Sequence, residues 1–397
     1  MRSRKDGTIR VSSGEVHSWA LNGLVQARLL KDHGWRCTAI VVLNIVLRAA
    51  ARCISISAAC RDLTKAPSDE AVMTALEEGI PKTLPVLEGH LNECLTGKLP
   101  RRMRRHPWQV AIDFHLEPYY GEPYKSRNEI YYGKARQGTK SFHAYASACI
   151  VEYGHRYTVA LTWVRRHESK VVVLRRLVAR IREIGLKIRR VLLDREFFNV
   201  AVIDFLQQEK FPFLMPVVIR GRAPKKGRPV TGLRWIKRQR AGWYSHTMKN
   251  GKTQVTFPVC VAYGKPKKSK KRKSSKKTKP KGPKLLYCAW GVYGSPTDLR
   301  ELYRGRFGIE TSYRQMRQAR IYTCTRNPYI RLFFRAIGMI LRNLWVWIHA
   351  TRLPDGAGLT LTVRLERLRF KRMLEWIVRE VILQYHDGTR PCVVIQV

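Results

Sequence analysis

The spacing of apolar residues predicts that the chain begins with helices. Residues 16–96 show helical spacing throughout. Within them, two short helices are separated by a turn at residues 65–67, and Ser68 is the expected N-cap of the second. A basic stretch, residues 101–108, then leads into a region with a different pattern.

Alternating apolar and polar positions after this stretch predict a sheet. The segment that begins at Trp108 and a hairpin centred on Tyr153–Gly154 both have the alternation of strands. Helical and buried-strand patterns follow in turn: a helix at 168–185, a short strand within 188–198, a helix at 200–210 and a strand at 211–219. Three strands followed by helix, strand, helix and strand predict a mixed α/β sheet with a parallel part.

A β-rich insertion is expected at residues 219–294. An Asn-Gly pair at 250–251 indicates a hairpin turn, and residues 255–264 and 284–294 are strand-like. Between the strands lies a lysine-rich run, residues 265–284, which cannot bury apolar surface. We expect it to be a disordered loop, which either contacts DNA backbone or is simply solvated.

The last part of the chain is predicted to be helical. Ser295 is the expected N-cap of a helix, and residues 328–350 and 359–385 have amphipathic helical spacing. If the helix after Ser295 continues to residue 317, four side chains share a stripe about 60° wide. These are Tyr303, Arg306, Glu310 and Arg317.

These changes of pattern divide the chain into five segments. The expected division is a helical N-terminal domain at 1–100, the first part of an α/β core at 101–218, the β-rich insertion at 219–294, the rest of the core at 295–350 and a C-terminal helical segment at 351–397.

The charge of the chain points to a polyanionic partner. The sequence has 76 Lys and Arg against 29 Asp and Glu, a formal net charge of +47. The lysine-rich run holds twelve of these cations, so the rest of the chain is strongly basic as well. A basic chain of this kind is expected to bind nucleic acid. In that setting the early helix, turn and helix suggest a DNA contact, although an ordinary helical hairpin explains the pattern equally well.

Neither a membrane nor an oxidising compartment is expected. The apolar stretches 37–47 and 332–350 are too short or are interrupted by arginines, so neither reaches the roughly 20 residues of a membrane span. The first residues lack the apolar core of a signal peptide. Nine cysteines without a C-x-x-C pair are typical of reduced thiols, which predicts a cytoplasmic protein.

Three acidic residues are the candidate site. Asp113 lies on the first predicted strand, Asp194 closes a short apolar strand, and Glu310 lies on the helix after the insertion. Carboxylates without His or Cys suit Mg²⁺ or Mn²⁺, and two such ions about 4 Å apart can activate an attacking oxygen and stabilise a leaving one on phosphorus. Taken singly, each acid has an ordinary explanation: a polar strand end, a local ion pair with Arg195, or an ion pair with an arginine four residues away.

The residues also resemble a known family. Tyr303-x2-Arg306-x3-Glu310-x6-Arg317 resembles the Y-R-E-K signature of prokaryotic insertion-sequence transposases of the DDE class. "AIDFHLEPYYG" and "LLDREFF" resemble their first and second aspartate motifs, and the resemblance covers residues 108–350. Arg317 stands where the signature has Lys, which keeps the charge but changes the geometry of a phosphate contact.

The resemblance implies a fold, site residues and partners. It implies a ribonuclease-H-like mixed sheet flanked by helices, with the β-rich insertion before the last acidic residue and end-binding helices at the N-terminus. Asp113, Asp194 and Glu310 would be catalytic and would bind two Mg²⁺ ions, for which Mn²⁺ can substitute. Tyr303, Arg306 and Arg317 would hold DNA phosphates. A homodimer on double-stranded DNA, comprising element ends and target, is expected in the prokaryotic cytoplasm, associated with the nucleoid.

The sequence therefore predicts a metal-dependent transposase that hydrolyses a phosphodiester at the element's end and then joins that end to target DNA. Two alternatives stay open: a structure-specific nuclease on the same core, and a non-catalytic DNA-binding protein derived from a transposase. Three insertion aromatics, Trp235, Trp243 and Tyr244, would either stack on a base or form the core of a small β domain.

Overall fold

The computed structural model describes residues 11–152, 156–224, 228–264, 282–353 and 367–385. The hairpin turn expected at Tyr153–Gly154 and most of the lysine-rich run lie outside these residues. No helix in the described part is both long enough and apolar enough to cross a membrane.

The N-terminal helices form as the apolar spacing predicts. They are α1 (Ser13–Gln26), α2 (Ala39–Arg52), α3 (Ile56–Arg61), α4 (Asp69–Gly79) and α5 (Leu84–Thr96). The side chain of Ser68 accepts a hydrogen bond from the backbone N–H of Ala71, which confirms it as the N-cap of α4. The C-terminal helix α12 (Phe370–Tyr385) packs against α1 and α2, where Ser13 donates a hydrogen bond to Glu380.

A mixed sheet forms the centre of the molecule and confirms the predicted fold class. Its core strands are β1 (Pro107–Pro118), β3 (Thr139–Ile150), β4 (Thr158–Val164), β5 (Lys187–Leu193) and β6 (Phe213–Pro216). β3 is antiparallel to both β1 and β4, while β5 is parallel to both β1 and β6. The resulting order, β4-β3-β1-β5-β6, is the ribonuclease-H-like arrangement.

The insertion strands continue this sheet. β7 (Gly242–Asn250) and β8 (Thr253–Tyr263) form the hairpin predicted from the Asn-Gly pair, with Gly251 at φ +56° in the turn. β9 (Lys284–Trp290) pairs with β8 on one side and with β6 on the other. Together with β2 (Tyr131–Arg136) on β3, the sheet has nine strands.

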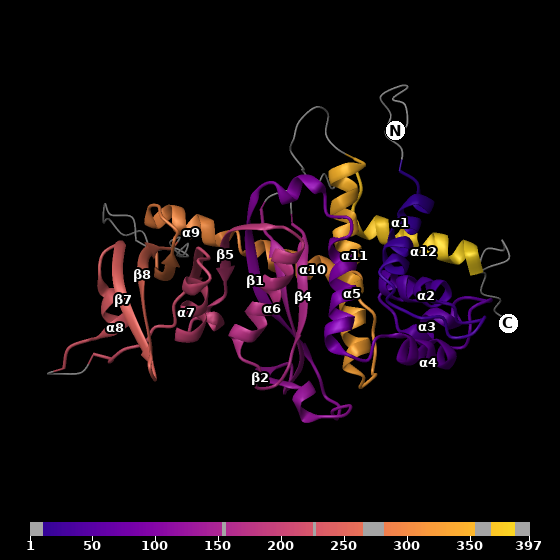
Figure 1. Ribbon diagram of the computed structural model, residues 1–397, viewed down its shortest axis with the longest axis horizontal. Helices are drawn as coiled ribbons and strands as arrows, with labels where there is room; N and C mark the ends of the chain where they lie inside the picture. Colours follow the sequence, from indigo (N-terminus) through magenta and orange to yellow (C-terminus); the bar gives the residue numbers. More distant parts are fainter. Residues whose placement is uncertain (1–10, 153–155, 225–227, 265–281, 354–366, 386–397) are drawn as a thin grey trace, which may run out of the picture.

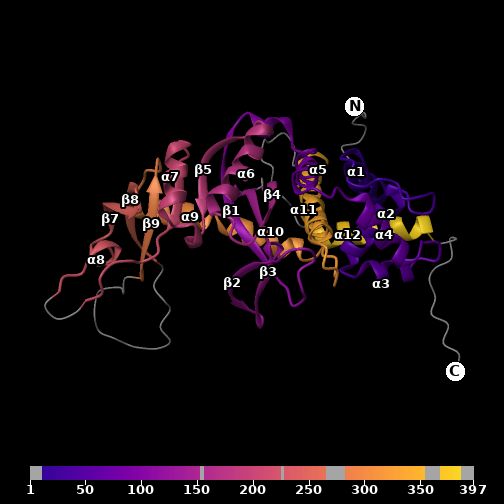
Figure 2. The ribbon, with the colours of Figure 1, turned by 60° about the horizontal axis from the view of Figure 1, so that its bottom comes forward.

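Helices join the sheet to the N-terminal segment. The helix α6 (Lys170–Glu183) packs on β3 and β4, and α7 (Val200–Gln208) packs on β7 and β8. The helix α11 (Pro328–Thr351), which is buried along most of its length, contacts α5 and β4. Figure 1 and Figure 2 show α5 and α11 between the sheet and the other N-terminal helices, with the insertion strands at the opposite end of an elongated molecule.

The structure corrects two helix predictions and adds two elements. The segment expected to be one helix to residue 317 is two, α9 (Pro296–Arg304) and α10 (Phe307–Met316), joined at Gly305 and Arg306. Of the helix expected at 359–385, residues 359–366 lie outside the described part, residues 367–369 are not helical, and α12 begins at Phe370. β2 and the short helix α8 (Gly232–Arg238) were not predicted. Three short 3₁₀ turns complete the described elements: Arg101–Arg104, Arg127–Glu129 and Arg195–Phe197.

Candidate active site

Two of the three predicted acids lie side by side where the pairing of two neighbouring strands ends. In the parallel pair β1–β5 the last paired residues are Ile112 and Leu193. Asp113 is the next residue of β1 and Asp194 is the first residue after β5, so parallel register brings both carboxyl groups to the same place in the sheet. The Asp113 side chain is 13% exposed and that of Asp194 is 39% exposed, so this position is half-open to solvent.

The third acid, Glu310, reaches the same place through Arg306. Arg306 Nη2 lies 2.6 Å from Glu310 Oε1 and 4.0 Å from Asp194 Oδ1, and Nη1 lies 3.2 Å from Asp113 Oδ2. Because two of these distances share Nη2, the oxygens of Glu310 and Asp194 can lie no farther apart than the two distances together. The structure therefore brings all three acids to one guanidinium group. The ion pair between Glu310 and Arg306, left open as an alternative explanation, is present as well.

A fourth acid, Glu196, was missed from the sequence. Asp113, Asp194 and Glu196 each offer a carboxylate oxygen, and these atoms all lie within 4.8 Å of one another. Glu196 lies on the 3₁₀ turn Arg195–Phe197 directly after β5. The signal that could have found it is its position two residues after Asp194 in the same motif. We refer to Asp113, Asp194, Glu196 and Glu310 as the acid cluster.

Burial and mutual repulsion shift the pKa values of two members of the cluster. The pKa of Asp113 is raised to about 7, chiefly by burial and in part by the nearby Asp194 and Glu196, although Arg306 acts to lower it. Burial also raises the pKa of Glu196, against the lowering effect of Lys170. The carboxylates are thus incompletely neutralised by the cations around them, which is the condition that a divalent cation relieves.

The donor set of the acid cluster fits a hard divalent metal. Four carboxylates converge and no His or Cys side chain joins them in the described part of the chain. Oxygen-only ligands of this kind suit Mg²⁺, Mn²⁺ and Ca²⁺ rather than Zn²⁺.

The three residues predicted to hold DNA phosphates have different environments. Arg306 is 6% exposed and faces the acids rather than solvent. Tyr303 is also buried, and its hydroxyl donates a hydrogen bond to the Leu193 carbonyl at 3.3 Å. Arg317 is exposed at the C-cap of α10 and forms no ion pair with any residue that the structure describes.

Exposed cations lie close to the cluster acids along the chain. Arg195 follows Asp194 directly, Arg314 lies four residues after Glu310 on α10, and Arg304 ends α9; each is exposed. Of the insertion aromatics, Trp235 is 49% exposed and its ring lies 6.4 Å from that of Tyr244, edge to face. Trp243 donates a hydrogen bond from Nε1 to the Gly294 carbonyl, so it fastens β7 to the segment before α9.

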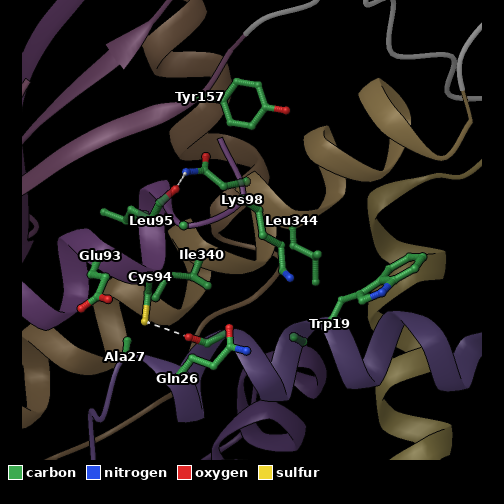
Figure 3. Close-up of a pocket in the computed structure, with 14 residues that line it drawn as sticks. Trp19, Gln26, Ala27, Glu93, Cys94, Leu95, Lys98, Tyr157, Ile340 and Leu344 are labelled. Carbon is green, nitrogen blue, oxygen red and sulfur yellow. Dashed lines mark hydrogen bonds between the residues drawn. The ribbon is translucent and has the colours of Figure 1, made fainter. Parts of the chain in front are cut away.

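A separate cavity lies away from the acid cluster. It has a volume of about 120 Å³ and lies between α1, α5 and α11, with Trp19, Lys98 and Tyr157 in its lining. Figure 3 shows these side chains around the hollow, with the Lys98 amine directed into it. None of the four acids lines this cavity, so it is a feature of the junction between the N-terminal helices and the core.

Known proteins resemble this chain in fold or in sequence. Among solved structures, the chain is similar to piggyBac transposase in a cryo-EM synaptic complex with hairpin DNA. The two share 12% identity at a TM-score of 0.48, over 94% of this chain and 78% of that chain. No curated protein matches the sequence. Residues 105–344, more than half of the chain, match the family model of the transposase DDE domain. The chain therefore belongs to the transposase DDE-domain family.

Proposed function

We propose that this protein is a DNA transposase of the prokaryotic insertion-sequence type, which cuts DNA at the ends of a mobile element and joins those ends to a target. The observation that carries the proposal is the parallel register of β1 and β5, which sets Asp113 beside Asp194 with Glu310 in reach. The match to the DDE family and the net charge of +47 support it.

In this proposal Asp113, Asp194 and Glu310 are catalytic and hold two Mg²⁺ ions, for which Mn²⁺ can substitute. Such ions polarise the phosphoryl oxygen and lower the pKa of a bound water. The protein's own contribution is to fix the carboxylates on two paired strands and one helix, at a position that is half-open to solvent and so within reach of a DNA strand. Glu196 adds a fourth oxygen donor within reach of both aspartates.

Phosphate binding is assigned to Tyr303, Arg306 and Arg317, with different roles. Arg317 is exposed and free of ion pairs among the described residues, so it can meet a backbone phosphate directly. Arg306 is committed to the acids in this structure. It can turn to DNA only when another cation takes over the carboxylates, which would couple cation binding to phosphate binding.

The wider partners are also proposals. Element ends and target are double-stranded DNA, bound by a homodimer in the prokaryotic cytoplasm with the nucleoid. The proposed domains follow the expected division, with the helices of residues 1–100 binding element ends. The exposed face of α4 carries Glu70, Glu77 and Glu78, which repel DNA. The acidity of this face does not favour α4 as a recognition helix, so we assign the contact to other surfaces of this segment.

The decisive experiment is cleavage of DNA that carries the sequences flanking the gene. Asp113→Asn and Glu310→Gln should bind this DNA with near-native affinity yet fail to nick it with Mg²⁺ present. The matched control is Glu301→Gln, which removes an exposed carboxylate of α9 that pairs with Arg300 and Arg304. Full nicking activity in either cluster variant would refute the assignment.

The joining step needs its own assay. Pre-cut end DNA incubated with plasmid and Mg²⁺ should give covalently joined product with the native chain. Cleavage without joined product would instead support the structure-specific nuclease. Absence of both across many DNA substrates would favour a DNA-binding protein without catalytic activity.

A further inference from the structure

A second polar site lies on the same face of β1 as Asp113. Side chains two and four residues apart on a strand point to the same face, which places Glu117 on the face of Asp113. There, a hollow of about 30 Å³ opens between the first half of α11 and the segment that follows α10. Its polar lining is Glu117, Thr323, Arg320, Arg331 and Arg335. We refer to these five residues as the arginine hollow.

The arginine hollow has more positive than negative charge. Arg335 Nη1 pairs with Glu117 Oε1 at 3.3 Å, which neutralises one of three arginines. Arg331 is held by uncharged groups, since its Nε donates to the Thr325 carbonyl at 2.6 Å. Although burial raises the pKa of Glu117, a hydrogen bond from His115 and the nearby arginines bring it down to about 2, so this carboxylate is charged at neutral pH. Neither Arg320 nor Arg331 forms an ion pair with a residue in the described part of the chain, so two cations remain without a counter-ion there.

Arg335 has donors without acceptors. The residue is 7% exposed, and its Nε and Nη2 have no hydrogen-bond partner among the described residues. A guanidinium carries five N–H donors, and a buried donor without an acceptor is costly. An acceptor that enters the hollow would therefore be bound in part by relieving this cost.

The size of the hollow selects among acceptors. A volume of about 30 Å³ holds roughly two water-sized groups. Water would satisfy the donors but would leave the two positive charges without a counter-ion. The two non-bridging oxygens of a backbone phosphate satisfy both requirements, since they have that size, accept hydrogen bonds and carry the negative charge.

We propose that the arginine hollow binds a backbone phosphate of the DNA strand whose cut lies at the acid cluster. Four residues of a strand separate Asp113 from Glu117, a distance of about 13 Å. Roughly two to four nucleotides span that length. The choice of DNA as the source of the phosphate rests on the proposed function, whereas the anion site itself does not.

The first measurement uses the full chain and inorganic phosphate in a calorimetric titration. Arg320→Gln removes an exposed cation from the lining and should weaken phosphate binding about tenfold. Glu117→Gln removes the carboxylate that competes for Arg335 and should strengthen it. Arg326→Gln is the matched control, since it removes an exposed arginine from the same segment but outside the lining, and should change nothing.

The second measurement uses flanking-sequence DNA in which single phosphates are replaced by uncharged methylphosphonates. One replacement, two to four nucleotides from the cut, should weaken binding by the native chain about tenfold and have little effect on Arg320→Gln. Equal phosphate affinity in Arg320→Gln and Arg326→Gln would overturn the anion site, even if Glu117→Gln fails to fold. Phosphate binding without any sensitive DNA position would overturn DNA as its source. Neither result depends on whether the protein cuts DNA.

Discussion

At the scale of single residues, the side chain of Arg306 supplies the positive charge that offsets the carboxylates of the acid cluster. The sequence pattern predicted a DNA contact, but the structure places the guanidinium between the carboxylates of Asp113, Asp194 and Glu310. Periodicity gives the face of a helix on which a residue lies. It does not show that two paired strands bring two more carboxylates to that face.

Removing this guanidinium should strengthen divalent-cation binding. Arg306→Gln leaves the carboxylates without their resident cation, so we expect Mn²⁺ affinity to rise about tenfold, measured by calorimetry on the full chain. Arg304→Gln removes an exposed arginine of α9 that pairs with Glu301 and should leave the affinity unchanged. Weaker Mn²⁺ binding in Arg306→Gln would mean that the arginine organises the carboxylates rather than competing for them.

Glu196 should contribute to cation binding although the family signature does not include it. Its oxygen lies within 4.8 Å of those of Asp113 and Asp194, so Glu196→Gln should lower Mn²⁺ affinity about tenfold in the same titration. The control is Glu183→Gln, an exposed glutamate at the end of α6. Native affinity in Glu196→Gln would leave Glu310 as the third carboxylate ligand.

His143 should make the fold sensitive to acid. It is buried, and burial and Arg331 lower its pKa to about 3. A histidine whose folded-state pKa is depressed costs stability as pH falls below its unfolded value of 6.5, because only the unfolded chain takes up the proton. Between pH 8 and pH 5 this residue should remove about 2 kcal/mol of unfolding free energy.

The variant His143→Phe keeps a ring and cannot titrate. The melting temperature of the variant minus that of the native chain should therefore be several degrees larger at pH 5 than at pH 8. An identical difference at both values would show that His143 is protonated in the folded state.

At the scale of secondary-structure elements, the sequence predicts the features that neighbouring residues determine, such as strand positions and helix caps. The alternating pattern placed Asp113 within the first strand, and the end of a short buried run placed Asp194 at the close of another. The caps at Ser68 and Ser295 are also where the pattern put them. The pairing of β9 with β6 could not be predicted from local patterns, because it joins segments more than seventy residues apart and leaves no periodic signal in the sequence.

The break between α9 and α10 shows the same limit. Gly305 has helical backbone angles, with φ −55° and ψ −27°, so nothing in the apolar spacing marks it. A Cβ atom at Gly305 would lie 2.8 Å from the side chain of Gln109 on β1. The chain turns there because it passes close to β1, and the turn directs Arg306 toward the acids.

A second close approach fixes α11, and a pair of glycine variants tests it. A Cβ at Gly338 would lie 2.6 Å from the Ala319 carbonyl oxygen, so Gly338→Ala should cost about 1–3 kcal/mol despite the better helix propensity of alanine. Gly89, in the interior of α5, has open space around the same position. Gly89→Ala should therefore stabilise the chain by up to about 1 kcal/mol. Thermal unfolding of the two variants should shift in opposite directions, and a stabilising Gly338→Ala would contradict the contact.

At the scale of the whole molecule, charge should govern DNA affinity. With a net charge of +47, the logarithm of the association constant should fall with the logarithm of salt concentration with a slope of about −5 or steeper, measured by fluorescence anisotropy. Replacing the exposed Arg314 and Arg317 by Gln should reduce this slope by about 2.

The control for this measurement is a lysine at the end of β5 that lies away from the acid cluster. Lys187 is exposed at the start of β5, whereas Asp194 follows the end of that strand, about 20 Å away. Lys187→Gln should leave the slope unchanged. A slope near zero in the native chain would mean that its basic residues do not meet phosphates.

The shared sheet restricts how this protein can be recombined with its relatives. β9 has hydrogen-bonded partners on both sides, β6 and β8. Deleting the insertion would therefore leave one edge of β6 unpaired. A chimaera that exchanges these strands must supply another strand to pair with β6. Otherwise the unpaired backbone groups of β6 can pair with another chain, which promotes aggregation. The insertion therefore cannot be removed as an independent unit. Exchanging it between proteins requires that β6, the strand next to β5, keeps a pairing partner.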